Sequence, residues 1–581
     1  MKKYFKRSLS VLLSALMAGT ALSASAIATA ATVTTSSPVA AKSYGLPDKI
    51  EDGAILHCWC WSFNTIKENI PQIAAAGFKS IQTSPINKVW DGNKNGDMSL
   101  KSSNKGNWWY QYQPVDFTIG NYQLGTEDEF KAMCEEAHKY GVKVVVDIVS
   151  NHCTSEFSAI SARVKNVAGS SKTTFHQVTQ ISDWSNRYQV TQGHLTGLWD
   201  LNTQNAKVQQ MIYNYITHVL DDGADGFRFD AAKHIELPDD DASYAGNYWT
   251  TILNNDAEFQ YGEILLGADR AADYAKLMKI TAEGYGTNLR AGLEKKKVTA
   301  ATAKNYRIAD VDAGQLITWV ESHDTYCTDD IPSQQQYSSW MKINNEQVQQ
   351  GWAIIASQGD TTPLFFARPK GSQAYDPNES SPTSKKNFNN KWGENTIGIA
   401  GDGNYFSDEV VAVNKFRNAM VGESKNVVDA VKSKVTMIER GTKGAVLVNV
   451  TDADVDVSVT TKIADGEYTD QANGGTFTVK NGKLTGTVPA GAVAVVYTPE
   501  EEGDDDVIVG DLDGDGEVTV KDATILQRHL AEFTNEDGSA IVDETDPKAV
   551  KVADVDGDGS ITVMDVSAIQ RIVAEFSAVP A

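Results

Sequence analysis

The stretch Gly226-Phe227-Arg228-Phe229-Asp230-Ala231-Ala232-Lys233-His234 decides the fold. A short apolar run is followed at once by an acid and by basic residues, which is typical of a buried parallel strand that ends in functional side chains. Similar runs recur between residues 45 and 400, with helical patterns between them. The predicted strands are 55–61, 80–85, 142–149, 226–230, 259–264, 316–321 and 363–367, and the clearest helices are 127–140, 205–221 and 345–357.

This alternation of strands and helices over about 350 residues predicts parallel βαβ units and an α/β fold, and the length suits an eight-fold barrel with insertions. The polar, loop-rich segment 153–199 follows the third strand and is predicted to be the largest insertion. From 401 to 498 the pattern changes to β-like runs broken by turns. That change predicts a small antiparallel β domain.

Polar side chains follow four predicted strands, at the ends where eight-fold barrels carry their active sites. The third strand ends in residues 147–152, the fifth in 262–263 and the seventh in 323–324, and the fourth is the stretch quoted above. One acid after a strand is most often a helix cap. Caps do not need arginine and histidine companions, so the four ends together predict a converging group around Asp230, Glu263 and Asp324.

Three converging acids fit retaining glycoside hydrolysis. One carboxylate attacks the anomeric carbon, and a second, about 5–5.5 Å away, protonates the leaving oxygen and then activates water. A third acid orients sugar hydroxyls and raises the pKa of the proton donor, since like charges disfavour ionisation. An arginine beside the nucleophile keeps that carboxylate ionised.

Residues 147–152, 226–234, 262–263 and 323–324 resemble, in order, four signature segments of glycoside hydrolase family 13, the α-amylase family. The likeness covers roughly residues 50–498 and is strongest to secreted bacterial members with a short domain B. It implies a (β/α)8 TIM barrel over 45–400, a domain B over 153–199 and an antiparallel domain C over 401–498. It also implies that Asp230 is the nucleophile, Glu263 the general acid/base and Asp324 the third acid.

The same resemblance assigns the sugar and metal contacts. The implied substrate-binding residues are Tyr112, Gln113, His152, Arg228, Lys233, His234 and His323. A structural Ca²⁺ would be held by Asn151, Asp200 and the backbone oxygens of Thr191 and His234, an oxygen set that suits this hard cation. Gly223 and Asp225 resemble a second calcium site.

The C-terminal part contains a repeat, in which residues 511–522 recur as 554–565. Both copies have the ligand spacing of an EF-hand loop and its glycine at position six, with Asp instead of Glu at position twelve. The predicted Ca²⁺ ligands are Asp511, Asp513, Asp515, Glu517 and Asp522 in one loop and Asp554, Asp556, Asp558, Ser560 and Asp565 in the other.

Each loop leads into a helical pattern, 522–533 and 565–576, that contains a Gln-Arg pair. Paired loop–helix repeats of this kind resemble a dockerin, here 510–581, the module that binds a cohesin on a scaffold protein. The resemblance implies cohesin contacts at Gln527, Arg528, Gln570 and Arg571. The alternative is a calcium-stabilised domain without a partner.

Charge follows the same division of the chain. The 52 basic and 76 acidic residues give a net charge of −24, and residues 500–581 contain 22 acidic and 5 basic residues. An acidic linker over 499–509 therefore joins a nearly neutral body to an acidic module. Nucleic-acid binding is excluded, because it needs a basic surface, and so is docking to an anionic membrane surface.

Residues 1–30 are typical of a secretory signal peptide, with a basic start, an apolar run over 9–22 and small residues after it, and 31–44 form a linker. A membrane anchor is the alternative, although the run is shorter than the ~18 apolar residues of a spanning helix. We expect export, to the extracellular space or to a cell-surface complex through a scaffold. The five cysteines are expected to be buried thiols.

The sequence thus predicts an exported α-amylase that hydrolyses internal α-1,4-glucosidic bonds of starch with retention, attached through its dockerin to a cohesin-bearing scaffold. One alternative is a transglycosylase of the same family. Another is a non-catalytic glucan-binding scaffold subunit, which the presence of all three acids disfavours.

Overall fold

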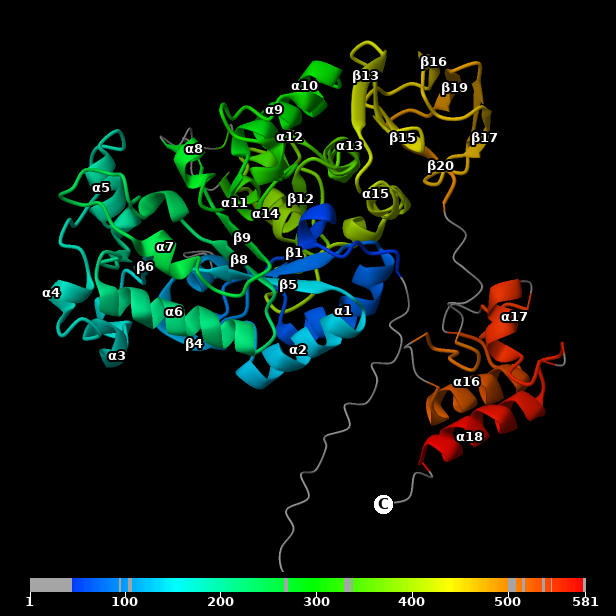
Figure 1. Ribbon diagram of the computed structural model, residues 1–581, viewed down its shortest axis with the longest axis horizontal. Coiled ribbons are helices and arrows are strands. Elements are labelled where there is room, and N and C mark those ends of the chain that lie inside the picture. The colour runs from blue at the N-terminus through cyan, green and yellow to red at the C-terminus, as the bar shows by residue number, and fades with distance from the viewer. Residues whose placement is uncertain are drawn as a thin grey trace, which may run out of the picture. The chain divides into compact units, whose positions relative to one another are not determined.

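The computed structural model describes residues 44–92, 96–102, 107–265, 270–328, 335, 338–499, 508–514, 518–535, 539–544, 546–557 and 559–577. Eight parallel strands close into a barrel in which neighbouring strands follow one another along the chain (Figure 1). They are β1 (Ile55–Cys58), β2 (Ser80–Thr83), β5 (Lys143–Ile148), β8 (Gly226–Phe229), β9 (Phe259–Gly262), β10 (Lys279–Thr281), β11 (Leu316–Thr318) and β12 (Thr362–Phe366). The predicted eight-fold barrel is confirmed.

The sequence predicts seven of these strands and misses β10. Its three residues, Lys-Ile-Thr, contain no apolar run, and they join the sheet by pairing with β9 and β11. Pairing with neighbours here overrides a weak local signal.

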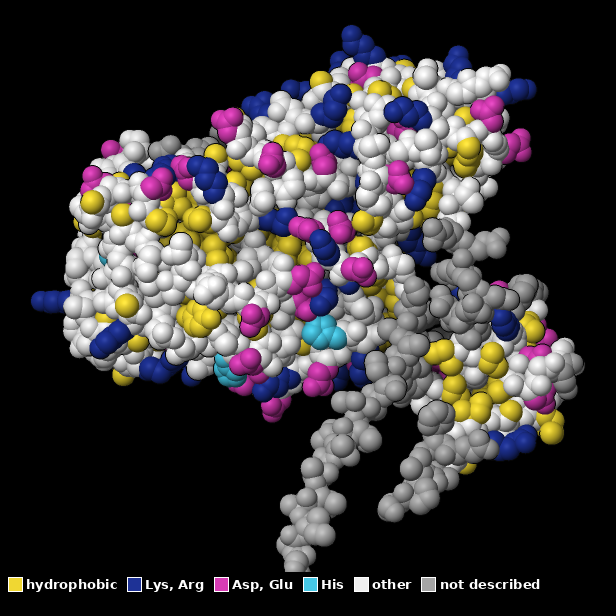
Figure 2. Space-filling view, in the orientation of Figure 1, with side chains coloured by type: hydrophobic (Ala, Val, Ile, Leu, Met, Phe, Trp, Pro, Cys, Tyr) yellow, Lys and Arg dark blue, Asp and Glu magenta, His cyan; other side chains and the backbone are white. Residues whose placement is uncertain are grey.

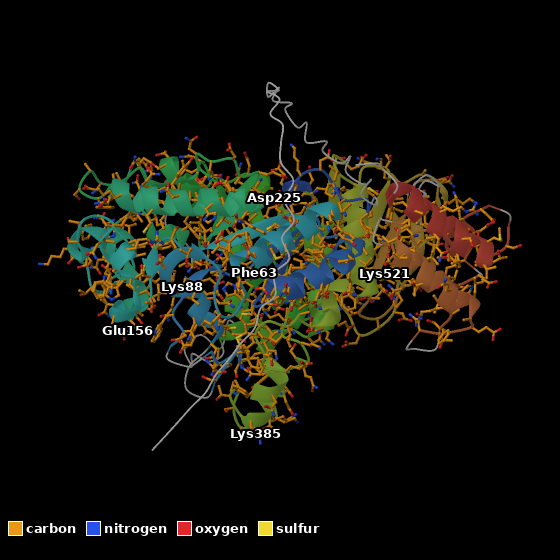
Figure 3. All side chains as sticks on the ribbon, turned by 90° about the horizontal axis from the view of Figure 1, so that it is seen from below. Phe63, Lys88, Glu156, Asp225, Lys385 and Lys521 are labelled. Carbon is orange, nitrogen blue, oxygen red and sulfur yellow. The ribbon has the colours of Figure 1, made fainter. Side chains whose placement is uncertain are left out.

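Helices cover the outside of the barrel and begin at caps that the sequence encodes. Capping boxes precede α2 (Glu127–Lys139) and α13 (Asn345–Ala356) and satisfy amide groups that a helix start leaves free. These two helices and α6 (Ala206–Asp221) agree with the predicted ranges to within one residue. The other helices around the barrel are α1 (Phe63–Ala75, which begins at the Phe63 labelled in Figure 3), α7 (Tyr248–Ile252), α8 (Ala271–Tyr274), α9 (Glu283–Glu294), α10 (Ala300–Lys304), α11 (His323–Cys327), α12 (Ser339–Lys342), α14 (Lys385–Trp392) and α15 (Asp408–Ala419).

Two insertions leave the C-terminal ends of barrel strands. After β2, β3 (Asn87–Val89) pairs antiparallel with β4 (Pro114–Ile119). After β5 comes the predicted domain B, whose two ends pair as β6 (His152–Cys153) and β7 (Trp199–Asp200). Between them lie α3 (Ala162–Lys165), α4 (Ser171–Thr174) and α5 (Arg187–Gln192). This pairing closes the insertion at its base, beside the barrel.

Two apolar layers hold the barrel together, and β5 shows how one strand serves both. Val145 belongs to the inner cluster, with Ile317 and Leu364. Val144 and Val146 belong to the outer cluster, which lies between strands and helices. Alternation of side chains along a strand produces this division, and burial on both faces explains the continuous apolar run.

Beyond the barrel lie two antiparallel four-stranded sheets that share an apolar core. One has the order β13 (Lys425–Val431), β14 (Val435–Arg440), β15 (Gly444–Asn449), β20 (Val493–Tyr497), and the other β16 (Val455–Thr460), β19 (Lys483–Val488), β18 (Thr476–Lys480), β17 (Gly466–Thr469). The antiparallel character is confirmed. Helix α15 lies past the predicted boundary at residue 400, yet it packs against α13 and buries Val410 and Phe416 in the outer barrel cluster. It also packs against β20, where the Phe416 and Tyr497 rings lie 5.5 Å apart, so α15 lies between the barrel and the antiparallel sheets.

The C-terminal module, described by itself, contains α16 (Val520–Leu530), α17 (Pro547–Ala553) and α18 (Val563–Ser577). Helices α16 and α18 pack against each other around a small core that includes Leu526 and Ile569. These two residues occupy the same position in the two repeats. Both helices begin two residues before the predicted start, because the last loop residues already take helical geometry.

All five cysteines are buried free thiols, as predicted. Among the helices of the described residues, none has the length and apolarity needed to cross a membrane. The predicted signal peptide and N-terminal linker lie almost wholly outside the described residues, as does most of the acidic linker.

We expect Arg417→Ala to lower the free energy of unfolding by about 3 kcal/mol or more, because it leaves buried carbonyl groups without a donor. The buried Arg417 guanidinium of α15 donates to four backbone oxygens of the barrel at 2.9–3.1 Å. Urea unfolding followed by tryptophan fluorescence measures the effect, since all twelve tryptophans lie between Trp59 and Trp392. The exposed Lys415 of the same helix is the control, with a change within about 0.5 kcal/mol on Lys415→Ala; equal losses would contradict the prediction.

Candidate active site

The predicted acids converge at the C-terminal ends of the barrel strands. Asp230 follows β8, Glu263 follows β9, and Asp324 lies in α11, after β11. Ala231 has a left-handed backbone (φ 50°), and its amide donates to Glu263 Oε2 at 3.1 Å. This turn places the acids that follow β8 and β9 side by side.

One buried guanidinium joins the acids. Arg228 Nη1 lies 2.9 Å from Asp230 Oδ1 and 2.8 Å from each oxygen of Asp147, and Nη2 lies 2.6 Å from Glu263 Oε1. Arg228 is 4 % exposed, and a charge so deeply buried requires paired neighbours. We call these four residues the Arg228 cluster.

Asp147 belongs to the first signature segment, but no role is predicted for it from the sequence. The signal for it was an acid inside the otherwise apolar strand β5, Lys-Val-Val-Val-Asp-Ile. Burial raises the pKa of Asp147 to about 7, while Arg228 lowers it. The buried carboxylate of Asp147 is paired with the Arg228 guanidinium and accepts a hydrogen bond from the Tyr112 hydroxyl.

The electrostatic environment suits Glu263 to acid–base work. Burial raises the pKa of Glu263, Arg228 lowers it, and the charge of Asp324 raises it again. Burial also raises the pKa of Asp230, and the positive charge of Arg228 lowers it. Asp324 is more open, with 41 % of its side chain exposed. A buried carboxyl beside a second acid can hold a proton near neutral pH.

Neutral hydrogen-bonding groups surround the acids. The Tyr112 hydroxyl donates to Asp147 Oδ2 at 3.0 Å, and its ring stacks on His323 with centroids 5.3 Å apart. His152 Nε2 lies 4.0 Å from Asp230 Oδ2. Burial lowers the pKa of His152 to about 4 and that of His323 to about 3. Both imidazoles are therefore uncharged and can bond to a neutral, hydroxyl-rich ligand.

The remaining predicted substrate residues connect the segments that surround the acids, and two of them contact domain B. Gln113 Oε1 accepts a hydrogen bond from Thr154 Oγ1 at 2.7 Å. His234 Nδ1 lies 2.9 Å from a backbone oxygen of α5, and Lys233 Nζ donates to a backbone oxygen of the segment after β9 at 3.2 Å. Each contact fixes one wall of the site against another element.

Two aromatic residues near the site, His57 and Trp184, are not predicted from the sequence. His57 of β1 packs edge-on against His323, with centroids 5.4 Å apart. Trp184 of domain B is 57 % exposed, and its ring lies 6.0 Å from that of His234. Neither belongs to a motif, so only the folded arrangement identifies them.

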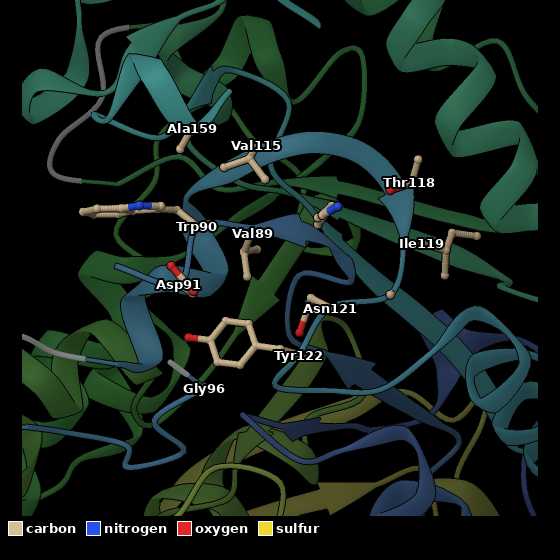
Figure 4. A pocket seen from close by; sticks show the side chains of 12 residues that line it. Val89, Trp90, Asp91, Gly96, Val115, Thr118, Ile119, Asn121, Tyr122 and Ala159 are labelled. Carbon is tan, nitrogen blue, oxygen red and sulfur yellow. The ribbon is translucent and has the colours of Figure 1, made fainter. Parts of the chain in front are cut away.

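A hollow of about 620 Å³ lies on the β3–β4 pair and is lined in part by Trp90, Asp91 and Tyr122 (Figure 4). None of its lining residues is among the predicted catalytic or substrate-binding residues. The assignment of the site therefore rests on the convergent acids.

The predicted structural calcium residues fit a cation. Asp200 is 1 % exposed, and its carboxylate meets Asn151 Nδ2 at 3.1 Å and His176 Nδ1 at 2.6 Å. Within the described residues no lysine or arginine pairs with Asp200, and burial raises its pKa to about 7. Thr191, in α5, and His234 lie on the two elements joined by the His234–α5 contact. A Ca²⁺ ion would supply the missing positive charge.

The resemblance of Gly223 and Asp225 to a second calcium site fits the structure less well. Asp225, labelled in Figure 3, precedes β8 and lies at the end of the barrel away from the acids. Its Oδ1 lies 2.8 Å from Lys143 Nζ and its Oδ2 2.8 Å from His138 Nε2. Both oxygens thus already have basic partners, which disfavours a metal ion there.

The two repeat loops bring their acids together in matching ways. Carboxylate oxygens of Asp511, Asp513 and Asp522 lie within 4.8 Å of one another, and those of Asp554, Asp556 and Asp565 do the same. The last acid of each loop accepts three corresponding backbone N–H groups. Ser560 is exposed, and Asp515, Glu517 and Asp558 lie outside the described residues. The described acids suit Ca²⁺.

Comparison with known proteins agrees with this geometry. Residues 62–352, half of the chain, match the family described as alpha amylase, catalytic domain. The chain belongs to the α-amylase family. Residues 509–574 match the dockerin type I domain, so an α-amylase catalytic domain is followed here by a C-terminal dockerin.

Two curated relatives are named α-amylase. That of Butyrivibrio fibrisolvens is 39 % identical over 487 residues, which cover 77 % of this chain and 47 % of the relative. That of Clostridium acetobutylicum is 35 % identical over 464 residues, 78 % of this chain and 55 % of the relative. The chain spans about half the length of these relatives.

Solved α-amylase structures share the fold. α-Amylase I of Eisenia fetida superposes with a TM-score of 0.62 at 19 % sequence identity. The match covers 78 % of this chain and 98 % of the Eisenia fetida chain. The α-amylase of Geobacillus thermoleovorans, complexed with acarbose, superposes with a TM-score of 0.58 at 15 % sequence identity. The match covers 78 % of this chain and 99 % of the Geobacillus chain.

Asp147→Asn is expected to lower kcat on soluble starch about 100-fold. In this variant one amide oxygen replaces the two carboxylate oxygens that orient Arg228. Asp230 and Glu263, which Arg228 holds, would then lose their alignment. Initial rates of reducing-end release measure this. Asp116→Asn is the matched control, since Asp116 also pairs with an arginine, Arg163, but outside the Arg228 cluster. An Asp147→Asn enzyme as active as the control would remove Asp147 from the site.

Proposed function

We propose that the protein is a secreted α-amylase that hydrolyses internal α-1,4-glucosidic bonds of starch and related glucans with retention, attached through its dockerin to a cohesin-bearing scaffold. The observation that carries the proposal is the Arg228 cluster. In it, the two terminal nitrogens of one guanidinium contact Asp230 and Glu263. This favours the short carboxylate separation, about 5–5.5 Å, that retaining enzymes use.

The residues present suit both steps of the reaction. In the first, Glu263 gives its proton to the glycosidic oxygen while Asp230 attacks the anomeric carbon, so the carbon–oxygen bond breaks and a glycosyl ester forms. In the second, Glu263 takes a proton from water, which attacks the same carbon and releases Asp230. Arg228 keeps Asp230 ionised, and Asp324, His152 and His323 hold sugar hydroxyls.

Calcium supports this architecture in the proposal. One ion at Asn151, Asp200 and the backbone oxygens of Thr191 and His234 ties domain B to the barrel, and one ion in each dockerin loop orders the start of α16 or α18. These ions are structural, and no chemical step runs through them.

The dockerin presents matching residues to a partner. Gln527, Arg528, Gln570 and Arg571 are all exposed. Val520 and Val563, at the same position of the two repeats, are 64 % and 69 % exposed. Exposed apolar side chains beside polar ones are typical of a protein interface. The two valines extend the cohesin-binding surface beyond the predicted residues.

Product analysis tests the catalytic proposal. We expect soluble starch to yield linear oligosaccharides whose new reducing ends are initially α-anomers in the proton NMR spectrum. Asp230→Asn should lower kcat about 10⁴-fold and Glu263→Gln about 10²–10⁴-fold, since they remove the nucleophile and the proton donor. Cyclic or branched products would instead favour the transglycosylase, and unchanged hydrolysis by Asp230→Asn would refute the assignment.

The pH profile gives an internal check on Glu263. The negative charge of Asp324 raises the pKa of Glu263, so Asp324→Asn lowers that pKa. Because a general acid acts while protonated, the alkaline limb of the kcat/KM profile should move to lower pH in the residual activity of this variant.

Cohesin binding tests the docking proposal. Binding of the full chain to a panel of cohesins should require Ca²⁺ and disappear in excess EGTA, because the loop acids then repel one another. Asp522→Ala with Asp565→Ala should abolish binding and leave starch hydrolysis unchanged, whereas Glu532→Ala, an exposed acid outside the loops, should change neither. A chain that binds no cohesin in Ca²⁺ would support the calcium-stabilised module without a partner.

A further inference from the structure

A cluster of ligand-type side chains lies on the outer surface of the barrel, where the C-terminal end of α6 meets the N-terminal end of α2 (Figure 1). Glu127 is the first residue of α2. His218 and Asp222 lie one turn apart at the end of α6, a spacing that puts both on one helix face. We call these three residues the α2–α6 cluster. Figure 2 shows histidine, acidic and basic side chains gathered near this end of the two helices.

One member of the cluster is buried and incompletely bonded. The side chain of Asp222 is 4 % exposed, and its Oδ2 has no hydrogen-bond partner among the described residues. Oδ2 is directed toward His218 Nε2, 3.7 Å away and beyond hydrogen-bond reach. A buried carboxylate oxygen without a partner is costly, so this atom indicates a ligand.

The distances match a metal site. His218 Nε2 lies 3.1 Å from Glu127 Oε1 and 3.7 Å from Asp222 Oδ2, and the three ligand atoms all lie within 4.8 Å of one another. In a tetrahedral site with metal–ligand bonds of about 2.0–2.1 Å, ligand atoms are roughly 3.3 Å apart. The two distances from His218 lie on either side of this value, and the two carboxylate oxygens lie within 4.8 Å of each other, so the side chains need to rotate only a little to reach tetrahedral geometry.

The nearby lysine is compatible with a bound cation. Lys131 Nζ lies 3.1 Å from Asp222 Oδ1 and 3.5 Å from Glu127 Oε1. It thus neutralises one of the two carboxylate charges and leaves Oδ2 open. Lys131 is 43 % exposed and has solvent into which it can turn.

We propose that Glu127, His218 and Asp222 bind a divalent transition-metal ion of the Zn²⁺ class, with water in the fourth position, that links α2 to α6. One imidazole and two carboxylates suit Zn²⁺, whereas Ca²⁺ takes six to eight oxygens. The site is remote from the acids at the barrel mouth, because it lies on the helices that cover the outside. Its role is to stabilise the barrel, independently of the proposed starch hydrolysis.

Titration of the full chain with ZnCl₂ tests the proposal. CaCl₂ is present throughout, so that the oxygen-donor sites are filled. We expect one zinc-dependent binding event by calorimetry and a rise in Tm of at least about 2 °C, since a ligand that binds only the folded state stabilises it. Visible d–d absorption of bound Co²⁺, typical of four-coordination, should report the same site.

Variants separate a metal site from a plain ion-pair network. His218→Ala should weaken Zn²⁺ binding by at least about 100-fold and abolish the zinc-dependent rise in Tm, because it removes a ligand. Lys131→Met should bind Zn²⁺ more tightly, since it removes a competing positive charge. The matched control is His138→Ala, which should bind Zn²⁺ like the parent. His138 is also an exposed histidine, but it pairs with one acid, Asp225. Equal zinc responses in His218→Ala and the parent, or no zinc response in the parent, would overturn the proposal.

Discussion

The active site depends on the burial of the Arg228 guanidinium at the mouth of the barrel. A cation that is 4 % exposed is tolerated only where anions surround it, and here they come from three consecutive strands of the sheet. Asp147 of β5 lies directly opposite Arg228 in the register of β5 and β8, and Tyr261, two residues before Glu263, lies opposite Arg228 on β9. The register of these three strands therefore also sets the positions of the carboxylates around Arg228.

Domain B is connected to the same centre through a short pair of strands. In the β6–β7 pair, His152 faces Asp200. His152 approaches the acid after β8, and Asp200 is the buried carboxylate of the proposed calcium site. An ion held by Asp200 would thus fix the strand that carries His152. In the proposed function, such an ion would support sugar binding by His152 without taking part in the chemistry.

The acidic residues serve different purposes in different parts of the chain. In the dockerin loops, aspartates provide an all-oxygen environment, and the corresponding amide contacts of Asp522 and Asp565 show that both repeats fold alike. On the outer barrel surface, Glu127 and Asp222 meet an imidazole instead. The ligand type, and not the density of negative charge, distinguishes the two kinds of site.

The sequence by itself determined the barrel, the antiparallel sheets, the paired C-terminal repeat and the three acids, because each follows from a local pattern: buried apolar runs, capping residues, loop spacing and polar residues at strand ends. Tertiary structure decided the rest. Strand β10 exists through its pairing with β9 and β11, and α15 takes its place by packing against both α13 and β20. The roles of Asp147 and His57, the basic partners of Asp225 and the open oxygen of Asp222 depend on residues distant in the sequence. Pairing, burial and charge compensation between distant residues arise only when the chain has folded, and no local pattern records them.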